Sequence, residues 1–346
     1  MNLRLSAAET WAPDGPAVRV IDAHTGGEPL RIIVSGYPVP QGRTILERRR
    51  DLIDNHDRLR TALMWEPRGH ADMYGCLITP PVSDDADFGV LFMHNEGYST
   101  MCGHGIIAVT TVVLETGMLP RAAPMARLII DSPAGKITAY ARMSRGKVDS
   151  VRFENVPSFA LALDQEIAVP GYGIVPYDIA YGGAFYAYVE ASKVGLTCTP
   201  DHYRELIEAG QAIKEAIMTS VNIAHPFETD LGFLYGTIFI GPAESSAAHS
   251  RNVCVFAEGE VDRCPTGTGV SGRAAIHMAR GEIDLNEPLR IESIIGSSFT
   301  VRVLRRCKCG PHQAIIPEVE GRAFMTGRSS FHLDSRDPLC HGFLLR

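Results

Sequence analysis

The segment Cys102-Gly103-His104-Gly105-Ile106 has a counterpart later in the chain, Thr266-Gly267-Thr268-Gly269-Val270. The spacing between the two segments also separates Gly117 from Gly281. Residues 106–116 and 270–280 are mostly apolar or small and about three helical turns long. This pattern predicts two buried helices, each with a glycine-rich N-terminus and a glycine after its C-terminus.

The repeat continues beyond these helices. Ile130-Asp131-Ser132 in the first copy corresponds to Ile291-Glu292-Ser293 in the second. Such a regular copy indicates a gene duplication and predicts two domains of similar fold. A chain of 346 residues is long enough for two domains with separate cores.

Shorter patterns around the repeat predict a mixture of strands and helices. Period-two and continuous apolar runs predict strands at 18–24, 30–34 and 89–94. Apolar residues at helical spacing predict helices over 43–63 and 200–218.

The composition excludes several classes of protein. Lys and Arg total 33 against 40 Asp and Glu, so the net charge of −7 argues against nucleic-acid binding through a general basic field. No apolar stretch is long enough to span a membrane, and residues 1–15 lack the apolar core of a secretory signal. We therefore expect a cytoplasmic protein without nucleic-acid or membrane partners, in which the eight cysteines are thiols.

The start of each predicted helix presents unpaired backbone N–H groups and a partial positive charge. Two such ends facing one cleft would hold an anion, most simply a carboxylate or a phosphate. Neither copy contains the Gly-Lys-Ser/Thr of a phosphate-binding loop, so nucleotide binding is poorly supported.

Cys102 stands at the first helix start, where the helix dipole lowers a thiol pKa. The sequence thus indicates a thiolate that acts as nucleophile or general base, although a buried inert cysteine is the alternative. We expect no dyad with His104, because residues two apart on a helix do not face each other.

The second copy has Thr266 at the position of Cys102, with Cys264 two residues earlier. A threonine hydroxyl can form hydrogen bonds but is too weakly acidic to replace a thiolate. Asp262 would either bind a substrate ammonium or complement the helix dipole. Cys307-Lys308-Cys309 lacks a second cysteine pair, so no metal site is predicted.

The chain resembles the proline racemase family in four ordered motifs that span nearly its whole length: 22–29, 66–75, 101–105 and 262–269. The resemblance implies an α+β fold of the diaminopimelate epimerase-like type. Its two similar domains each wrap a mostly antiparallel, barrel-like sheet around a central helix. We expect a first domain of 1–158 plus 323–346 carrying Cys102, and a second of 159–322 carrying Asp262 and Thr266.

The resemblance also implies roles for single residues and a site that works without cofactor or metal. Cys102 would accept a proton, and Thr266 would lie on the opposite face of the substrate. The substrate would be bound by the following residues: Gly103, His104, Asp262, Gly267 and Thr268.

Racemases and epimerases of this family have a second cysteine at the position of Thr266, whereas the cysteine–threonine branch resembles trans-3-hydroxy-L-proline dehydratase. The implied reaction is α-proton abstraction by Cys102 and loss of water, which forms Δ1-pyrroline-2-carboxylate. The acid that protonates the leaving hydroxyl stays open among Thr266, His104 and water. Hydroxyproline would be the small-molecule partner, and the family resemblance allows a homodimer.

Two other functions stay open at this point. A 4-hydroxyproline 2-epimerase or proline racemase would need Cys264 or a water as its second acid. A non-catalytic amino-acid-binding protein would retain the fold without the chemistry.

Overall fold

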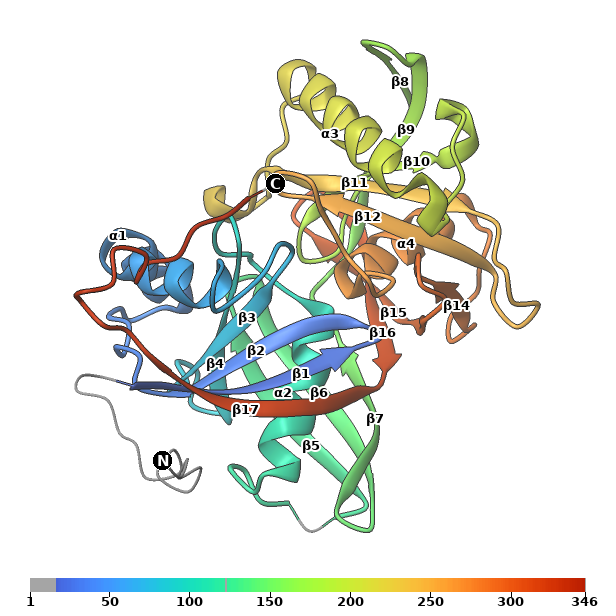
Figure 1. Cartoon of the computed structure of the whole chain (residues 1–346). Coiled ribbons are helices and arrows are strands. Elements are labelled where there is room, and N and C mark those ends of the chain that lie inside the picture. Colours follow the sequence, from blue (N-terminus) through green and yellow to red (C-terminus); the bar gives the residue numbers. More distant parts are fainter. Residues whose placement is uncertain (1–16, 122, 346) are drawn as a thin grey trace.

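The computed structural model describes residues 17–121 and 123–345, and its strands form one continuous, mostly antiparallel sheet. The sheet is folded into two similar halves, each wrapped around one buried helix (Figure 1). The predicted α+β fold with two similar units is therefore confirmed. The expectation about a secretory signal concerns residues 1–15, which lie outside the described residues.

The first half combines N-terminal strands with the last strand of the chain. These strands are β1 (Ala17–Thr25), β2 (Glu28–Ser35), β3 (Tyr74–Thr79), β4 (Phe88–His94), β5 (Met125–Ser132), β6 (Gly135–Ser144), β7 (Lys147–Glu154) and β17 (Ala323–His332). They pair in the order β17–β1–β2–β3–β4–β5–β6–β7, with parallel pairing only at β2–β3 and β4–β5.

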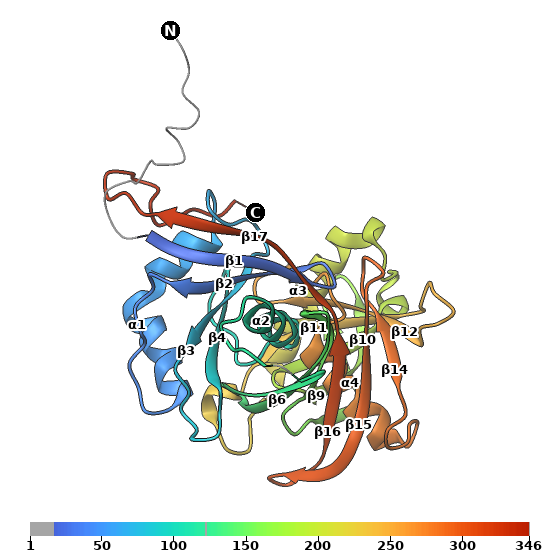
Figure 2. The same cartoon turned by 90° about the horizontal axis from the view of Figure 1, so that it is seen from below.

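Helix α2 (Gly103–Glu115) lies inside this ring of strands, where Figure 2 shows it end-on. All of its residues from Gly103 to Leu114 are buried. A helix that is apolar on every side is stable only when it is enclosed, which explains why this segment forms the centre of its half.

The second half repeats this plan around helix α4 (Gly267–Arg280). Its strands are β8 (Phe159–Val169), β9 (Gly173–Tyr181), β10 (Phe185–Glu190), β11 (Leu234–Gly241), β12 (Ser250–Phe256), β13 (Glu260–Val261), β14 (Leu289–Glu292), β15 (Ser298–Cys309) and β16 (His312–Gly321). Both central helices were predicted from the repeat, and each is followed by a glycine with positive φ, Gly117 or Gly281.

One strand joins the halves. β16 pairs with β15 of the second half, and its residues Glu318–Gly321 pair with Val151–Glu154 of β7 in the first half. The backbone hydrogen bonds therefore run without interruption from one half to the other.

The duplication extends to the packing of loops. Asp131 on β5 accepts hydrogen bonds from the backbone N–H groups of Val82 and Ser83, at 2.7 and 2.9 Å. Glu292 on β14 does the same for Glu244 and Ser245, both at 2.9 Å. The two carboxylates, matched in the sequence repeat, thus fix equivalent loops.

The remaining helices lie outside the sheet. They are α1 (Ile45–Met64), α3 (Tyr203–Ser220) and the short 3-10 helices η2 (Ala191–Val194), η3 (Pro200–His202) and η4 (Thr229–Leu231). α1 begins at a capping box in which Thr44 and Glu47 exchange hydrogen bonds. α3 begins later than expected, because the Pro200 turn is a 3-10 helix.

The strands predicted at 18–24, 30–34 and 89–94 correspond to β1, β2 and β4. Within residues 17–121 and 123–345, every helix is too short or too polar to cross a lipid bilayer.

Candidate active site

The N-termini of α2 and α4 touch each other at two glycines. A Cβ atom added to Gly103 would lie 2.5 Å from the Cα of Gly267, and one added to Gly267 would lie 2.6 Å from the Cα of Gly103. Real Cβ contacts are not this short. Glycine at both positions therefore lets the two helix ends, with their unpaired N–H groups, converge on one place.

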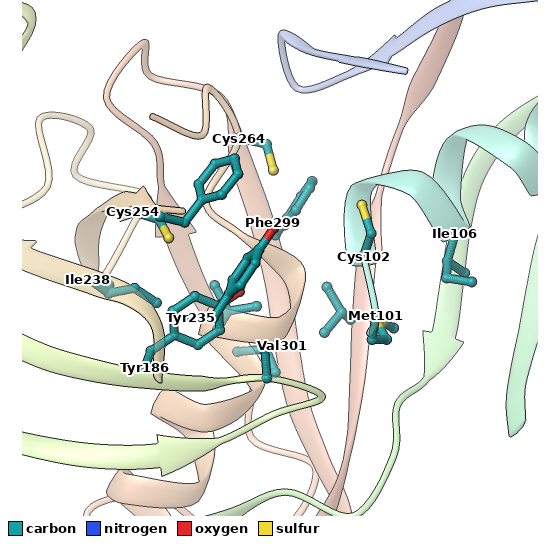
Figure 3. Packing of buried hydrophobic residues seen from close by; sticks show 14 of the residues in the cluster. Met101, Cys102, Ile106, Tyr186, Tyr235, Ile238, Cys254, Cys264, Phe299 and Val301 are labelled. Atoms are coloured by element: carbon teal, nitrogen blue, oxygen red, sulfur yellow. The ribbon is translucent and has the colours of Figure 1, made fainter. Parts of the chain in front are cut away.

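A nearly closed pocket of about 20 Å³ lies beside this contact, and all seven residues predicted to form the site border it: Cys102, Gly103, His104, Asp262, Thr266, Gly267 and Thr268. Five further residues complete its lining: Tyr74, Met101, Tyr186, Tyr235 and Phe256. In Figure 3, Cys102 lies at the start of α2, with Tyr186 and Tyr235 across from it on the second half.

Cys102 is the N-cap of α2 and is only 4% exposed. Its Sγ accepts a hydrogen bond from the backbone N–H of Gly105 at 3.2 Å, which lowers the thiol pKa. Burial and the nearby carboxylates of Asp262 and Glu28 act in the other direction and raise the pKa of Cys102 well above its usual value. In the unliganded protein, burial therefore opposes the expected thiolate more strongly than the helix terminus favours it.

The imidazole of His104 contacts this thiol, contrary to the expectation from helix geometry. The distance from Cys102 Sγ to His104 Nδ1 is 3.2 Å. Cys102 precedes the helix and has extended backbone angles, φ −144° and ψ 107°, so the rule for residues within a helix does not apply to it.

The surroundings of His104 define its protonation. Its Nε2 lies 3.3 Å from the carbonyl oxygen of Pro29, which can only accept a hydrogen bond, so Nε2 carries the hydrogen. Burial lowers the pKa of His104 and favours the neutral ring. Nδ1 is then an unprotonated acceptor that faces the Cys102 thiol.

Thr266 occupies the corresponding place at the start of α4. Its backbone has a φ of +68°, which is rare for a β-branched residue and is typical of strain at functional sites. Its hydroxyl is buried and makes no hydrogen bond of standard geometry among the described residues, while the Cys254 thiol lies close by. The hydroxyl is therefore available to a molecule in the pocket.

Cys264 does not border the pocket. Its side chain accepts the backbone N–H of Thr266 at 3.4 Å and packs toward Gly26 of the β1–β2 turn. Asp262 does border the pocket, and one of its oxygens accepts the Cys264 N–H at 2.9 Å. Among residues 17–121 and 123–345, no basic side chain forms an ion pair with Asp262. The carboxylate is thus available to a cationic group of a ligand.

Glu28 belongs to the 22–29 motif but was given no role from the sequence, yet it supports the site. It is completely buried, and its Oε2 accepts the backbone N–H of Arg263 at 2.7 Å, while Oε1 has no hydrogen-bond partner among the described residues. Burial, followed by the charge of Asp262, raises the pKa of Glu28 well above its usual value. Its position in a hairpin turn, 235 residues from Arg263, carries no local signal of this contact.

An aromatic wall, formed by Tyr74, Tyr186, Tyr235 and Phe256, faces the helix ends. Tyr235 stacks on Phe256 with ring centroids 5.3 Å apart, and the Tyr186 hydroxyl lies 2.8 Å from Thr268 Oγ1. None of the four was predicted to line the site: Tyr74 lies in the 66–75 motif but was given no role, and the other three belong to strands whose apolar runs are explained by burial alone. Such a wall suits the carbon atoms of a small ring.

Three side chains at or beside the pocket carry atoms that can ligate metals. His104, Asp262 and Cys264 each offer one ligand atom, and these lie within 4.8 Å of one another. Nitrogen, oxygen and sulfur donors of this kind suit zinc-like ions. The expectation of a metal-free site stays a prediction.

Because the two helix ends touch at Gly267, adding one methyl group there should strongly reduce activity. Gly267→Ala is expected to push α4 from α2 and to lower kcat/KM by about 10²-fold, because small displacements of binding groups are costly. Gly327→Ala is the matched control, since a Cβ there meets nothing within 4 Å. Steady-state kinetics with both variants checks this, and equal activity of the two would contradict it.

Comparisons with known proteins extend these observations. A family model described as proline racemase matches residues 20–344. A Colwellia psychrerythraea protein named trans-3-hydroxy-L-proline dehydratase is 51% identical over 95% of this chain and 93% of its own length. A human protein of the same name is 46% identical, with 96% of both chains covered.

A solved structure has the same fold as this chain. The hydroxyproline epimerase from Agrobacterium vitis, crystallised with trans-4-hydroxy-L-proline, matches with a TM-score of 0.91 at 32% identity, covering 96% of this chain and 95% of that one.

Proposed function

This chain belongs to the proline racemase family, and we propose that it dehydrates trans-3-hydroxy-L-proline to Δ1-pyrroline-2-carboxylate. The names of the relatives described above support the overall reaction. The observation that carries the proposal is the asymmetry of the pocket, which has the thiol of Cys102 at one helix end and the hydroxyl of Thr266 at the other. An enzyme that inverts a stereocentre would need an acid or base at both ends.

The substrate fits the charges of the pocket. Its carboxylate binds the N–H groups at the adjoining starts of α2 and α4, and its ring ammonium pairs with Asp262. The ring carbons pack on the aromatic wall. With the carboxylate held by fixed dipoles and the ammonium kept protonated, the charge that develops at the α-carbon is stabilised.

The stereochemistry of the substrate places both reacting groups on one face. In trans-3-hydroxy-L-proline the hydroxyl and the carboxylate lie on opposite faces of the ring, so the hydroxyl and the α-hydrogen lie on the same face. The Cys102–His104 pair, with its Sγ–Nδ1 distance of 3.2 Å, can therefore serve both groups. We assign the base to Cys102 and the acid for the leaving hydroxyl to His104.

The protons balance in this scheme. The Cys102 thiol first gives its proton to His104 Nδ1, and the resulting thiolate removes the α-hydrogen. The electrons of that C–H bond form the C2–C3 double bond as the C3–O bond breaks, and His104 protonates the departing oxygen to give water. The enzyme returns to its thiol and neutral imidazole, while the Δ2 product tautomerises to the Δ1 imine.

A substrate panel tests the proposal. Purified protein is expected to dehydrate trans-3-hydroxy-L-proline, with the product detected by mass spectrometry after reduction to proline. The cis-3-hydroxy isomer is the matched control, since its hydroxyl faces away from His104, and we expect its dehydration to be about 10²-fold slower. Ready epimerisation of 4-hydroxyproline without any dehydration would reject the proposal in favour of an epimerase.

The negative charge of Asp262 should influence the pH at which the Cys102 thiol becomes reactive. The Asp262 carboxylate raises the pKa of this thiol, so Asp262→Asn removes a negative charge and should lower the pKa. Alkylation of Cys102 by iodoacetamide, followed by peptide mass spectrometry, should then increase at a lower pH than in the wild type. Asp85→Asn, at an exposed surface position, is the control. A shift to higher pH in Asp262→Asn would contradict the assignment.

A further inference from the structure

Three side chains with metal-binding atoms meet where the catalytic pocket adjoins the loop before α4. A ring nitrogen of His104, a carboxylate oxygen of Asp262 and the sulfur of Cys264 lie within 4.8 Å of one another. Figure 3 shows the Cys264 sulfur on the second half and the Cys102 sulfur at the start of α2. His104 and Asp262 border the pocket, whereas Cys264 lies outside its lining. Residues from both halves of the molecule therefore converge on one side of the pocket.

These donors fit a small divalent ion that prefers nitrogen and sulfur. Zinc takes imidazole, carboxylate and thiolate ligands in tetrahedral sites, and water fills the fourth position when the protein supplies three. Its bonds of about 2.0 to 2.3 Å place neighbouring ligand atoms about 3.5 Å apart. Separations of at most 4.8 Å reach this geometry by small side-chain rotations. Magnesium and calcium, which take oxygen ligands, do not match the set.

The charges around this cluster favour a cation. Asp262 is 5% exposed and Glu28 is fully buried, and neither carboxylate forms an ion pair with a basic side chain in the described part of the chain. The guanidinium of Arg263 is bound by Asp72 at 2.6 Å. Glu28 Oε1 is also buried without a hydrogen-bond partner among the described residues. The negative charges of Asp262 and Glu28 both act on the Cys264 thiol, so a divalent ion there would meet two carboxylates that lack an ion pair.

We propose that His104, Asp262 and Cys264 bind Zn²⁺ or a similar thiophilic divalent ion, and that the bound ion inhibits the enzyme. The Cys264 thiol releases its proton when the sulfur ligates the ion, and the imidazole ligates through a nitrogen lone pair. The ion takes no part in the reaction. Metal binding is independent of the proposed function, and only the loss of turnover rests on it.

Inhibition follows from the residues that the ion would occupy. Asp262 is the proposed partner of the ring ammonium, and His104 is the proposed acid for the leaving hydroxyl. With both held by the metal, the substrate loses its cationic contact and the Cys102 thiol loses its proton acceptor. Zn²⁺ should therefore compete with the substrate and raise its apparent KM.

Cys264 allows the metal site to be changed separately from the reaction. Its sulfur accepts the backbone N–H of Thr266 at 3.4 Å and lies outside the pocket lining. Cys264→Ser replaces the thiolate by a hydroxyl, which is a poor zinc ligand, and leaves His104 and Asp262 in place. We expect zinc affinity to fall by about 10²-fold, because even residues that only support metal ligands cost up to this much when changed.

Inhibition by Zn²⁺ tests the proposal in steady-state kinetics with a reductant that contains no thiol. The wild type should be inhibited competitively with substrate, and Cys264→Ser should need about 10²-fold more Zn²⁺ for the same inhibition. Cys307→Ser, at a partly exposed cysteine on β15, is the matched control and should respond as the wild type does. Equal zinc sensitivity of the wild type and Cys264→Ser would overturn the proposal.

Cobalt binding identifies the ligating sulfur without any turnover. Co²⁺ titrated into the resting protein should give the absorption of a cobalt–thiolate bond in the wild type and in Cys102→Ser, but not in Cys264→Ser. Loss of this absorption in Cys102→Ser with retention in Cys264→Ser would place the ion on Cys102 and overturn the proposal. A protein that binds cobalt through Cys264 but does not dehydrate trans-3-hydroxy-L-proline would reject the proposed function and support the metal site.

Discussion

Cys102→Ser is expected to lower kcat/KM for trans-3-hydroxy-L-proline by about 10³-fold, which lies within the range for loss of a general base. The serine hydroxyl is far less acidic than a thiol, so His104 cannot generate an effective base from it. The backbone N–H groups at the start of α2 and the Asp262 carboxylate are unchanged, so substrate affinity should be largely retained. Single-turnover kinetics together with calorimetric titration of substrate measures the two quantities separately.

Cys264→Ser is the matched control for this experiment. Cys264 is buried like Cys102, but it lies outside the pocket lining, where its sulfur accepts the backbone N–H of Thr266 and lies near Asp262. We expect its activity to stay within about twofold of the wild type, since no interaction with substrate is lost. If Cys264→Ser loses activity and Cys102→Ser does not, the base has been assigned to the wrong sulfur.

Thr266→Cys is expected to introduce a reaction that the wild type lacks. A thiol at the start of α4 would face the substrate opposite Cys102 and could deliver a proton to the second face of the α-carbon. L-proline, which has no 3-hydroxyl to lose, should then be racemised, as followed by polarimetry. In heavy water the wild type should exchange the α-hydrogen with retention only.

Thr266→Ser is the control, because it keeps a hydroxyl and also lacks the β-branch of threonine. It should gain no racemase activity. Cysteine should be tolerated at the φ of +68°, since it is less crowded near the backbone than threonine. Absence of inversion in a folded Thr266→Cys protein would mean that the two helix starts do not face opposite sides of the substrate.

The features that could be predicted from the sequence are those that repeat or are local. The common spacing of Gly103 with Gly267 and of Gly117 with Gly281 located both central helices, and the residues next to Gly103 and Gly267 border one pocket. The helix over 43–63 followed from its apolar spacing alone.

The features that could not be predicted depend on burial and on contacts distant in sequence. The pairing of Cys102 with His104 was missed because the rule for helical neighbours was applied to a residue just outside the helix. The raised thiol pKa results from burial, to which the distant carboxylates of Asp262 and Glu28 add. Glu28 and Arg263 meet across the two halves, which no periodicity reveals.

The contact between Gly103 and Gly267 also limits how the two halves can move relative to each other. With backbones this close, the two halves can tilt about the glycines as about a pivot, but they cannot move apart there without losing the contact. Points near a pivot travel least, so the amides proposed to bind the substrate carboxylate would keep their arrangement during such a rocking motion. The aromatic wall, with Tyr74 on one half and Tyr186 and Tyr235 on the other, would travel farther in such a motion, which would separate entry of the proposed substrate from its recognition.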